Sequence, residues 1–179
     1  MNLKINGFLN ISFGENKESV IKKINERNGI LDSQNSTEES LIFNNINFAG
    51  RETSFLAFHF INDQFCRAMV FLKANLESKT VNLYKEIKYE INERFYKTRQ
   101  DFENYEAPFE QNDGYIDTAI SLGKANFSSF WSFKNEQAKE DDFISLKINE
   151  NFYIIITYEN GDLMDKYESN RKKNNYQDY

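Results

Sequence analysis

The chain has 179 residues, which is enough for one domain with a substantial hydrophobic core. Its content of 40% hydrophobic and 28% charged residues is ordinary for a globular protein. The formal net charge of −6 argues against a nucleic-acid-binding protein, because phosphate-binding surfaces need clustered lysine and arginine. An acidic chain is better matched to a basic protein partner, or to no charged partner at all.

The sequence contains no run of apolar residues as long as a membrane span, and residues 1–10 lack the apolar centre of a signal peptide. We therefore expect a soluble protein, either cytoplasmic or periplasmic with its export signal removed. Cys66 is the only cysteine, so the sequence excludes an intramolecular disulfide and a cysteine-based metal site.

The first predicted element is a helix between Asn16 and Asn28, with Asn16 as its N-cap. The preceding stretch FGENKES combines a glycine, a lysine and a serine, as phosphate-binding loops do. A Walker loop, however, needs a glycine immediately before Lys-Ser or Lys-Thr, and here Glu18 separates Lys17 from Ser19. The stretch therefore predicts the start of a helix.

Three strands of an antiparallel meander are predicted over residues 41–48, 53–61 and 65–72. Alternation divides the second and third strands into two faces. The face predicted to be core carries Leu56, Phe58, Phe60, Cys66, Ala68, Val70 and Leu72. The other face, predicted to be half-exposed, carries Phe55, Ala57, His59, Arg67, Met69 and Phe71.

A second helix is predicted over residues 78–95, followed by an irregular loop over 97–114. Four more strands are predicted over residues 115–123, 126–133, 142–148 and 152–158. The order helix, three strands, helix, four strands predicts an α+β fold, with helices on one face of an antiparallel sheet of about seven strands. Residues 1–158 are expected to form one domain with a pseudo-repeat of 1–75 and 76–158, and 159–179 a short helix or turn and a disordered tail.

The stretch ISFGENKESVIKKI, followed by LIFNNINFAG and a meander, resembles the opening of small bacterial envelope proteins. These are the β-lactamase-inhibitor-like proteins and the small lipoproteins of outer-membrane assembly. The resemblance covers the first third of the chain, and the second half by topology only. It implies protein binding without catalysis.

Catalytic and metal sites are poorly supported by the residues. His59 is the only histidine, and alternation places it on the opposite face from Cys66, so a Cys–His pair is not expected. Two calcium-like loops, around Gly114 and Gly161, have apolar or aromatic residues at both end positions. Carboxylates could act as a glycosidase pair, but they are better explained as a solvated surface: Asp101, Glu103, Glu106, Glu110, Glu140, Asp141 and Asp142. No metal and no cofactor is predicted.

The sequence therefore favours recognition of another protein over catalysis. The predicted partner-binding residues are aromatic, methionine and arginine side chains of the half-exposed face: Phe55, His59, Arg67, Met69 and Phe71. A second copy of the chain could occupy the same face. The preferred hypothesis is an inhibitor or immunity-type protein acting on a basic toxin or enzyme. The alternatives are an envelope accessory protein, a carrier of a small apolar ligand between sheet and helices, and, third, an enzyme.

Overall fold

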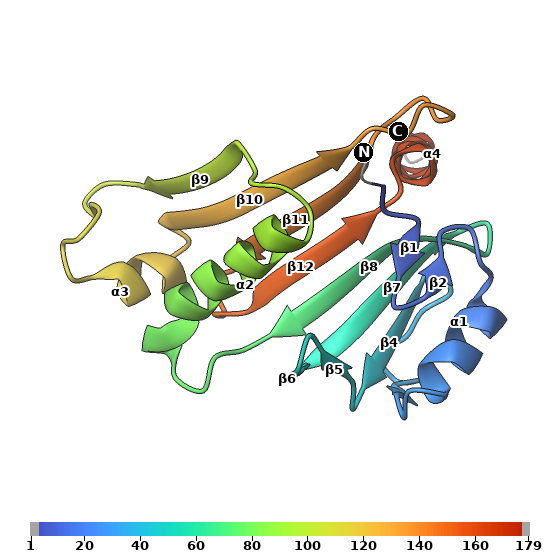
Figure 1. The fold of residues 1–179 in the computed structure, drawn as a ribbon, viewed down its shortest axis with the longest axis horizontal. Helices are drawn as coiled ribbons and strands as arrows, with labels where there is room; N and C mark the ends of the chain where they lie inside the picture. Colours follow the sequence, from blue (N-terminus) through green and yellow to red (C-terminus); the bar gives the residue numbers. More distant parts are fainter. Residues whose placement is uncertain (1–3, 177–179) are drawn as a thin grey trace.

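The protein is an α+β structure built on one eight-stranded antiparallel sheet (Figure 1). The computed structural model describes the backbone of residues 4–176 and the side chains of residues 4–172. The strands of the main sheet lie in the order β3-β4-β7-β8-β12-β11-β10-β9. Their bounds are β3 Ile30–Leu31, β4 Ser40–Asn44, β7 Phe55–Ile61, β8 Gln64–Leu72, β9 Gln100–Tyr105, β10 Ala125–Phe133, β11 Asp142–Ile148 and β12 Ile154–Glu159.

Four helices and two small hairpins complete the fold. The helices are α1 Lys17–Asn25, α2 Thr80–Arg94, α3 Ile116–Ser121 and α4 Gly161–Tyr176, and a short 3-10 turn over Glu77–Lys79 precedes α2. The hairpins pair β1 Gly7–Phe8 with β2 Ile11–Ser12, and β5 Asn47–Phe48 with β6 Arg51–Glu52.

The main sheet consists of two meanders that meet in its middle. In the first half α1 precedes β3, β4, β7 and β8, and in the second half α2 precedes β9, β10, β11 and β12. The last strands of the two meanders pair antiparallel, from Leu72 opposite Ile154 to Arg67 opposite Glu159. Each half is thus a helix followed by four strands, and the seam between the halves runs along β8 and β12.

Two elements of the second half differ from the sequence prediction. The strand predicted over residues 115–123 is wrong, because this segment contains helix α3, which buries Ala119 and Ile120. The loop predicted over 97–114 is wrong in part, since it contains β9, which pairs with β10 along its length. The sequence of β9 lacks apolar alternation because it is an edge strand whose side chains are almost all exposed.

The helices α1, α2 and α3 lie on one face of the sheet, which we call the helix-covered face. Val20 and Ile24 of α1 and Tyr84, Ile87 and Ile91 of α2 are buried there, against inward side chains of both meanders. Ile120 of α3 joins the same cluster at the end that carries β9 and β10. Burial of this apolar surface is the main contribution to the stability of the fold.

Helix α4 is placed differently, and Figure 1 shows it end-on beside one end of the sheet. Its first turn is held by Asp142, whose carboxylate accepts hydrogen bonds from the Gly161 amide (3.0 Å) and the Asn160 side chain (2.8 Å). The helix continues to Tyr176, further than the one or two turns predicted, and residues 177–179 of the predicted disordered tail lie outside the described residues. Within the part of the chain that is described, no helix is both long and apolar enough to cross a membrane.

The stretch FGENKES begins helix α1, as predicted. The Asn16 side chain accepts a hydrogen bond from the Ser19 amide at 2.9 Å, which is the expected N-cap contact. Glu15 accepts hydrogen bonds from the Ser12 amide and from Lys23 Nζ, both at 2.7 Å, and a further one from the Ser19 hydroxyl. Burial alone would raise the pKa of Glu15, but these bonds outweigh it and lower the pKa from 4.5 to about 2.

A folded-state pKa below the unfolded value means that ionised Glu15 stabilises the protein above about pH 4.5, and that this stabilisation is lost as the pH falls toward 2. We expect Glu15→Gln to lower the free energy of unfolding by about 1–2 kcal/mol at neutral pH, a value reduced for the partial exposure of the site. Urea unfolding of both proteins across pH should show the difference shrinking in acid. Glu26→Gln, at an exposed position, is the control and should change little; a pH-independent difference for Glu15→Gln would contradict the assignment.

Candidate protein-binding surface

The face of the sheet opposite α1 and α2, which we call the open face, presents three rows of side chains that cross the sheet by register. The first row is Phe55, Phe71, Ile155, Lys147, Ser128 and Phe102. The second row is Ile42, Ala57, Met69, Thr157, Ser145 and Phe130. The third row is Ser40, His59, Arg67, Glu159, Phe143 and Ser132.

All five predicted partner-binding residues lie on the open face and are half-buried. Phe55 and Phe71 stack with their ring centroids 4.1 Å apart, and Tyr153 meets both rings edge-on at 5.9 Å. Lys73 Nζ lies 4.4 Å from the centre of the Tyr153 ring. This aromatic group and Met69 form an apolar surface that water still reaches, which is the composition of many protein interfaces.

A polar row borders this apolar surface. Arg67 Nε lies 2.9 Å from Glu159 Oε1, at ion-pair distance but without hydrogen-bond geometry. Burial, together with the positive charge of Arg67, lowers the pKa of the neighbouring His59 to about 4. His59 is therefore neutral near pH 7. The charges of Arg67 and Glu159 neutralise each other, so this row of side chains has little net charge.

Helix α4 reaches the open face at the end near the β7–β8 turn. Met164 of α4 packs there against Ile61 and Cys66. The prediction that Cys66 faces the main core is wrong, because a β-bulge between His59 and Phe60 shifts the register, and Phe65 takes the inward position. Cys66 Sγ instead donates a hydrogen bond to the His59 carbonyl oxygen at 3.2 Å, and burial raises the pKa of this thiol to about 11. Such a thiol is not activated as a nucleophile.

The edge of the main sheet that is formed by β9 is strongly acidic. Residues 100–123, which we call the acidic lobe, include β9 and α3 and contain neither lysine nor arginine. The lobe contains six carboxylates: Asp101, Glu103, Glu106, Glu110, Asp113 and Asp117. Their summed formal charge of −6 equals the formal net charge of the whole chain, so the charges of all other residues cancel. We therefore expect the negative field of the protein to be centred on this lobe.

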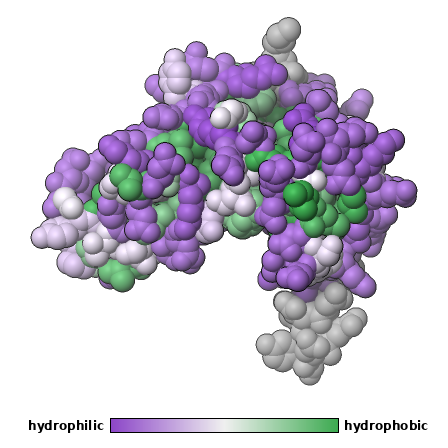
Figure 2. Space-filling view, turned by 90° about the horizontal axis from the view of Figure 1, so that it is seen from below, coloured by the Kyte–Doolittle hydropathy of each residue, from purple (hydrophilic) through white to green (hydrophobic). Residues whose placement is uncertain are grey.

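Large hydrophobic side chains are exposed among these carboxylates. Phe102 is 46% exposed, Tyr115 63% and Leu122 60%. Phe102 also belongs to the first row of the open face and meets Phe130 edge-on at 6.2 Å, so the acidic lobe and the open face form one continuous surface. Figure 2 shows hydrophobic side chains at the surface of its left-hand part, which corresponds to the side of β9 and α3 in Figure 1.

Sequence reasoning named four of the lobe carboxylates only as a solvated surface. The signal that it missed is the absence of lysine and arginine over residues 100–123, combined with exposed aromatic residues. The structure adds that part of this charge is used internally. Glu103 accepts hydrogen bonds from the Tyr105 hydroxyl (2.9 Å) and from Gln111 Nε2 (3.3 Å), and Asp113 accepts from the amides of Glu110 and Tyr115.

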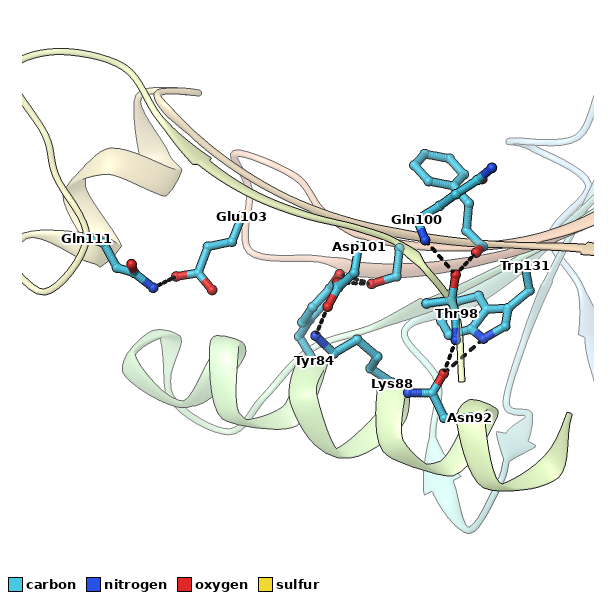
Figure 3. A network of polar contacts seen from close by, with 11 residues as sticks. Tyr84, Lys88, Asn92, Thr98, Gln100, Asp101, Glu103, Gln111 and Trp131 are labelled. Carbon is cyan, nitrogen blue, oxygen red and sulfur yellow. Dashed lines mark hydrogen bonds and ion pairs between the residues drawn. The ribbon is translucent and has the colours of Figure 1, made fainter. Parts of the chain in front are cut away.

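A polar network between α2 and the strands β9 and β10 holds the acidic lobe to the helix (Figure 3). Lys88 Nζ and Ser129 Oγ each donate to Asp101 at 2.7 Å, and the Tyr84 hydroxyl lies 2.6 Å from Ser129 Oγ. Burial would raise the pKa of Asp101, but the bonds from Lys88 and Ser129 hold it below its ordinary value. Burial raises the pKa of Tyr84. Ser129 is fully buried, so this hydroxyl joins strand to helix and is closed to a substrate.

A second contact of α2 lies one turn further along (Figure 3). Trp131 Nε1 donates to Asn92 Oδ1 at 3.1 Å and to the Tyr96 carbonyl oxygen at 3.0 Å. Asn92 Oδ1 also accepts from the Thr98 amide, and the Thr98 hydroxyl donates to the Phe130 carbonyl. These bonds fix the chain between α2 and β9, and therefore the position of the acidic lobe.

Among the residues described, no group of three or more histidine, cysteine, aspartate or glutamate side chains is placed to hold a metal ion. The loop around Gly114 is a turn closed by Asp113. In the loop around Gly161, Glu159 pairs with Arg67, and Asp162 accepts hydrogen bonds from the amides of residues 139 and 140. Comparisons with models of known protein families, with curated proteins and with solved structures gave no match to this chain. The functional argument therefore rests on the surface described above.

Proposed function

We propose that the protein acts by binding another protein of basic charge, as an inhibitor or immunity-type protein, and without catalysis. The observation that carries the proposal is the acidic lobe. The formal charge of this lobe, −6, equals the net charge of the whole chain, and the lobe lies beside the half-exposed apolar open face. Acidic surfaces steer basic partners and weaken binding to acidic ones. Aromatic, methionine and arginine side chains then supply the contacts that exclude water.

The side chains best suited to chemistry are buried or have pKa values that do not suit catalysis near pH 7. Ser129 and Tyr84 are buried in the network between α2 and the sheet, and Cys66 is a buried thiol with a raised pKa. Burial and the charge of Arg67 lower the pKa of His59 to about 4, which makes it a weak base. The arrangement therefore favours recognition, with the open face in the role predicted for Phe55, His59, Arg67, Met69 and Phe71.

Charge reversal in the acidic lobe tests this proposal. Glu106 and Glu110 are exposed. We expect Glu106→Lys with Glu110→Lys to leave folding intact and to weaken partner binding by about tenfold or more, because two attractive charges become repulsive. Glu26→Lys with Glu150→Lys, also at exposed positions, changes the net charge equally elsewhere and is the matched control.

The measurement is capture from extracts of the source cells at low and high salt, followed by affinities for the purified partner. The proposal requires that the partner is basic and that its affinity falls as the salt concentration rises. It also requires that the lobe variant, and not the control variant, loses affinity for this partner. Capture of nothing, or equal capture by the lobe and control variants, would contradict the proposal.

A further inference from the structure

A small pocket lies on the helix-covered face, over the seam between the two halves of the sheet. Its floor is formed by Leu72 of β8 and by Ile156 and Tyr158 of β12. One wall is α2 and its C-cap residue, with Ile87, Ile91 and Phe95, and the other is the β5–β6 hairpin, with Phe48. Its volume is about 190 Å³. Small-molecule sites often occur where two structural units meet.

The interior of the pocket is apolar and partly aromatic. Tyr158 packs against Phe8 at a centroid distance of 5.0 Å and against Phe48 at 6.4 Å, and Phe8 stacks on Phe48 at 5.5 Å. An apolar cavity of about 150 Å³ holds a benzene molecule, so this volume suits a ring or an alkyl chain of roughly six to nine carbon atoms.

The mouth of the pocket carries three charges that sum to +1. Arg51 of the hairpin donates two hydrogen bonds, of 2.8 and 2.6 Å, to the carboxylate of Glu90 of α2, so these two charges neutralise each other. The third charge is Arg94 of α2, which makes no ion pair within the described part of the chain. This local positive charge stands out in a protein whose net charge is −6.

The Tyr158 hydroxyl is the second polar group available to a ligand. Tyr158 lines the pocket, and its hydroxyl makes no hydrogen bond to another described residue. Arg94 and Tyr158 both line the pocket. Burial raises the pKa of Tyr158 to about 12, although the positive charge of Arg94 acts in the opposite direction. The apolar pocket is therefore lined by a neutral phenol donor and by a guanidinium that makes no ion pair with another described residue.

We propose that this pocket binds a small amphipathic carboxylate, with its alkyl or aryl body between α2 and the β5–β6 hairpin and its carboxylate on Arg94 and the Tyr158 hydroxyl. The apolar floor and the volume determine the size of the body. The unpaired arginine and the phenol donor determine the charge of the head group. The site is independent of the open face, which lies on the other side of the sheet.

Octanoate is the test ligand, with octan-1-ol and octylammonium as probes of the same chain length. Binding is followed by the amide chemical shifts of the pocket residues in the intact protein. We expect octanoate to bind roughly fivefold or more tightly than octan-1-ol, and octylammonium to bind most weakly. In Arg94→Glu the preference for octanoate over octan-1-ol should vanish. Arg99→Glu, an exposed arginine outside the pocket, should retain the preference.

A second pair of variants tests the apolar part of the site. Ile91→Phe adds volume within the pocket and should weaken octanoate binding about tenfold. Val81→Phe, on the same helix but outside the pocket, should not. Phe48→Trp fills the pocket from the hairpin side and replaces Ile91→Phe if that variant does not fold. The proposal is overturned by unchanged shifts at the pocket residues, by equal affinity for the three probes, or by octanoate binding that survives both filling variants.

Discussion

Replacing Val70 with glutamate is expected to abolish cooperative folding. Val70 is fully buried on the helix-covered face of β8, between Leu56 of β7 and Ile156 of β12. A carboxyl group there would have only apolar neighbours, and burying such a group without partners costs several kcal/mol, whether it stays charged or becomes protonated. This is a large part of the total stability of a domain of this size. Circular dichroism and urea unfolding would measure the loss.

The adjacent residue provides the control. Met69 points to the open face, where it is half-buried beside Ala57 and Thr157. The stem of a glutamate can cover the same neighbours while its carboxylate stays in water. We therefore expect Met69→Glu to change the free energy of unfolding by no more than about 1 kcal/mol. If Met69→Glu unfolds the protein as fully as Val70→Glu, the open face is core and is covered by another element.

A folded Met69→Glu protein also tests the role of the open face in recognition. If the partner covers Met69, the new carboxylate is trapped in the interface without a counter-charge, and binding should weaken although the fold is unchanged. Unaltered affinity would restrict the recognition surface to the acidic lobe. Glu106→Lys with Glu110→Lys and Met69→Glu thus separate the two parts of the proposed surface.

The sequence predicted the α+β class and the antiparallel meanders because both depend on local patterns. The strands around Leu56 and Val70 alternate cleanly, and the turn at Asn62 and Asp63 has the positive φ angles of a tight hairpin. The prediction failed where tertiary structure decides. Strand β9 is polar along its length and is a strand only because β10 pairs with it. Helix α3 is six residues long, too short for a clear helical period.

The candidate site was predicted in part, for the same reason. Alternation placed Phe55, His59, Arg67, Met69 and Phe71 on one face, and the register agrees. Cys66 was misplaced because a β-bulge inserts one residue, which strict alternation cannot represent. The pocket over the seam could not be predicted, since β8, β12, α2 and the β5–β6 hairpin meet only through the pairing of two strands more than eighty residues apart in the sequence.

Replacing Trp131 with alanine is expected to cause the largest loss of stability among substitutions that leave no charge in the core. The indole is fully buried between β10 and α2, and its N–H donates to Asn92 Oδ1 and the Tyr96 carbonyl. Removal of a buried tryptophan costs about 3–5 kcal/mol through lost apolar contact and the cavity left behind. Trp131→Phe retains most of the packing but loses both hydrogen bonds, so we expect a smaller cost of about 1–3 kcal/mol.

The neighbouring Phe130 separates the effect of burial from the effect of ring size. Phe130 lies on the same strand but faces the open side, where it is half-buried, so Phe130→Ala should cost only about 1–2 kcal/mol. Because Trp131 donates to the Tyr96 carbonyl and so holds the segment that leads into β9, its loss should also increase hydrogen exchange throughout the acidic lobe, whereas loss of the Phe130 ring should not. Equal destabilisation by the two alanine variants would contradict the role given to Trp131. Unchanged hydrogen exchange of the acidic lobe in the Trp131→Ala protein would show that α2 does not position the lobe, which would then be held only by the pairing of β9 with β10.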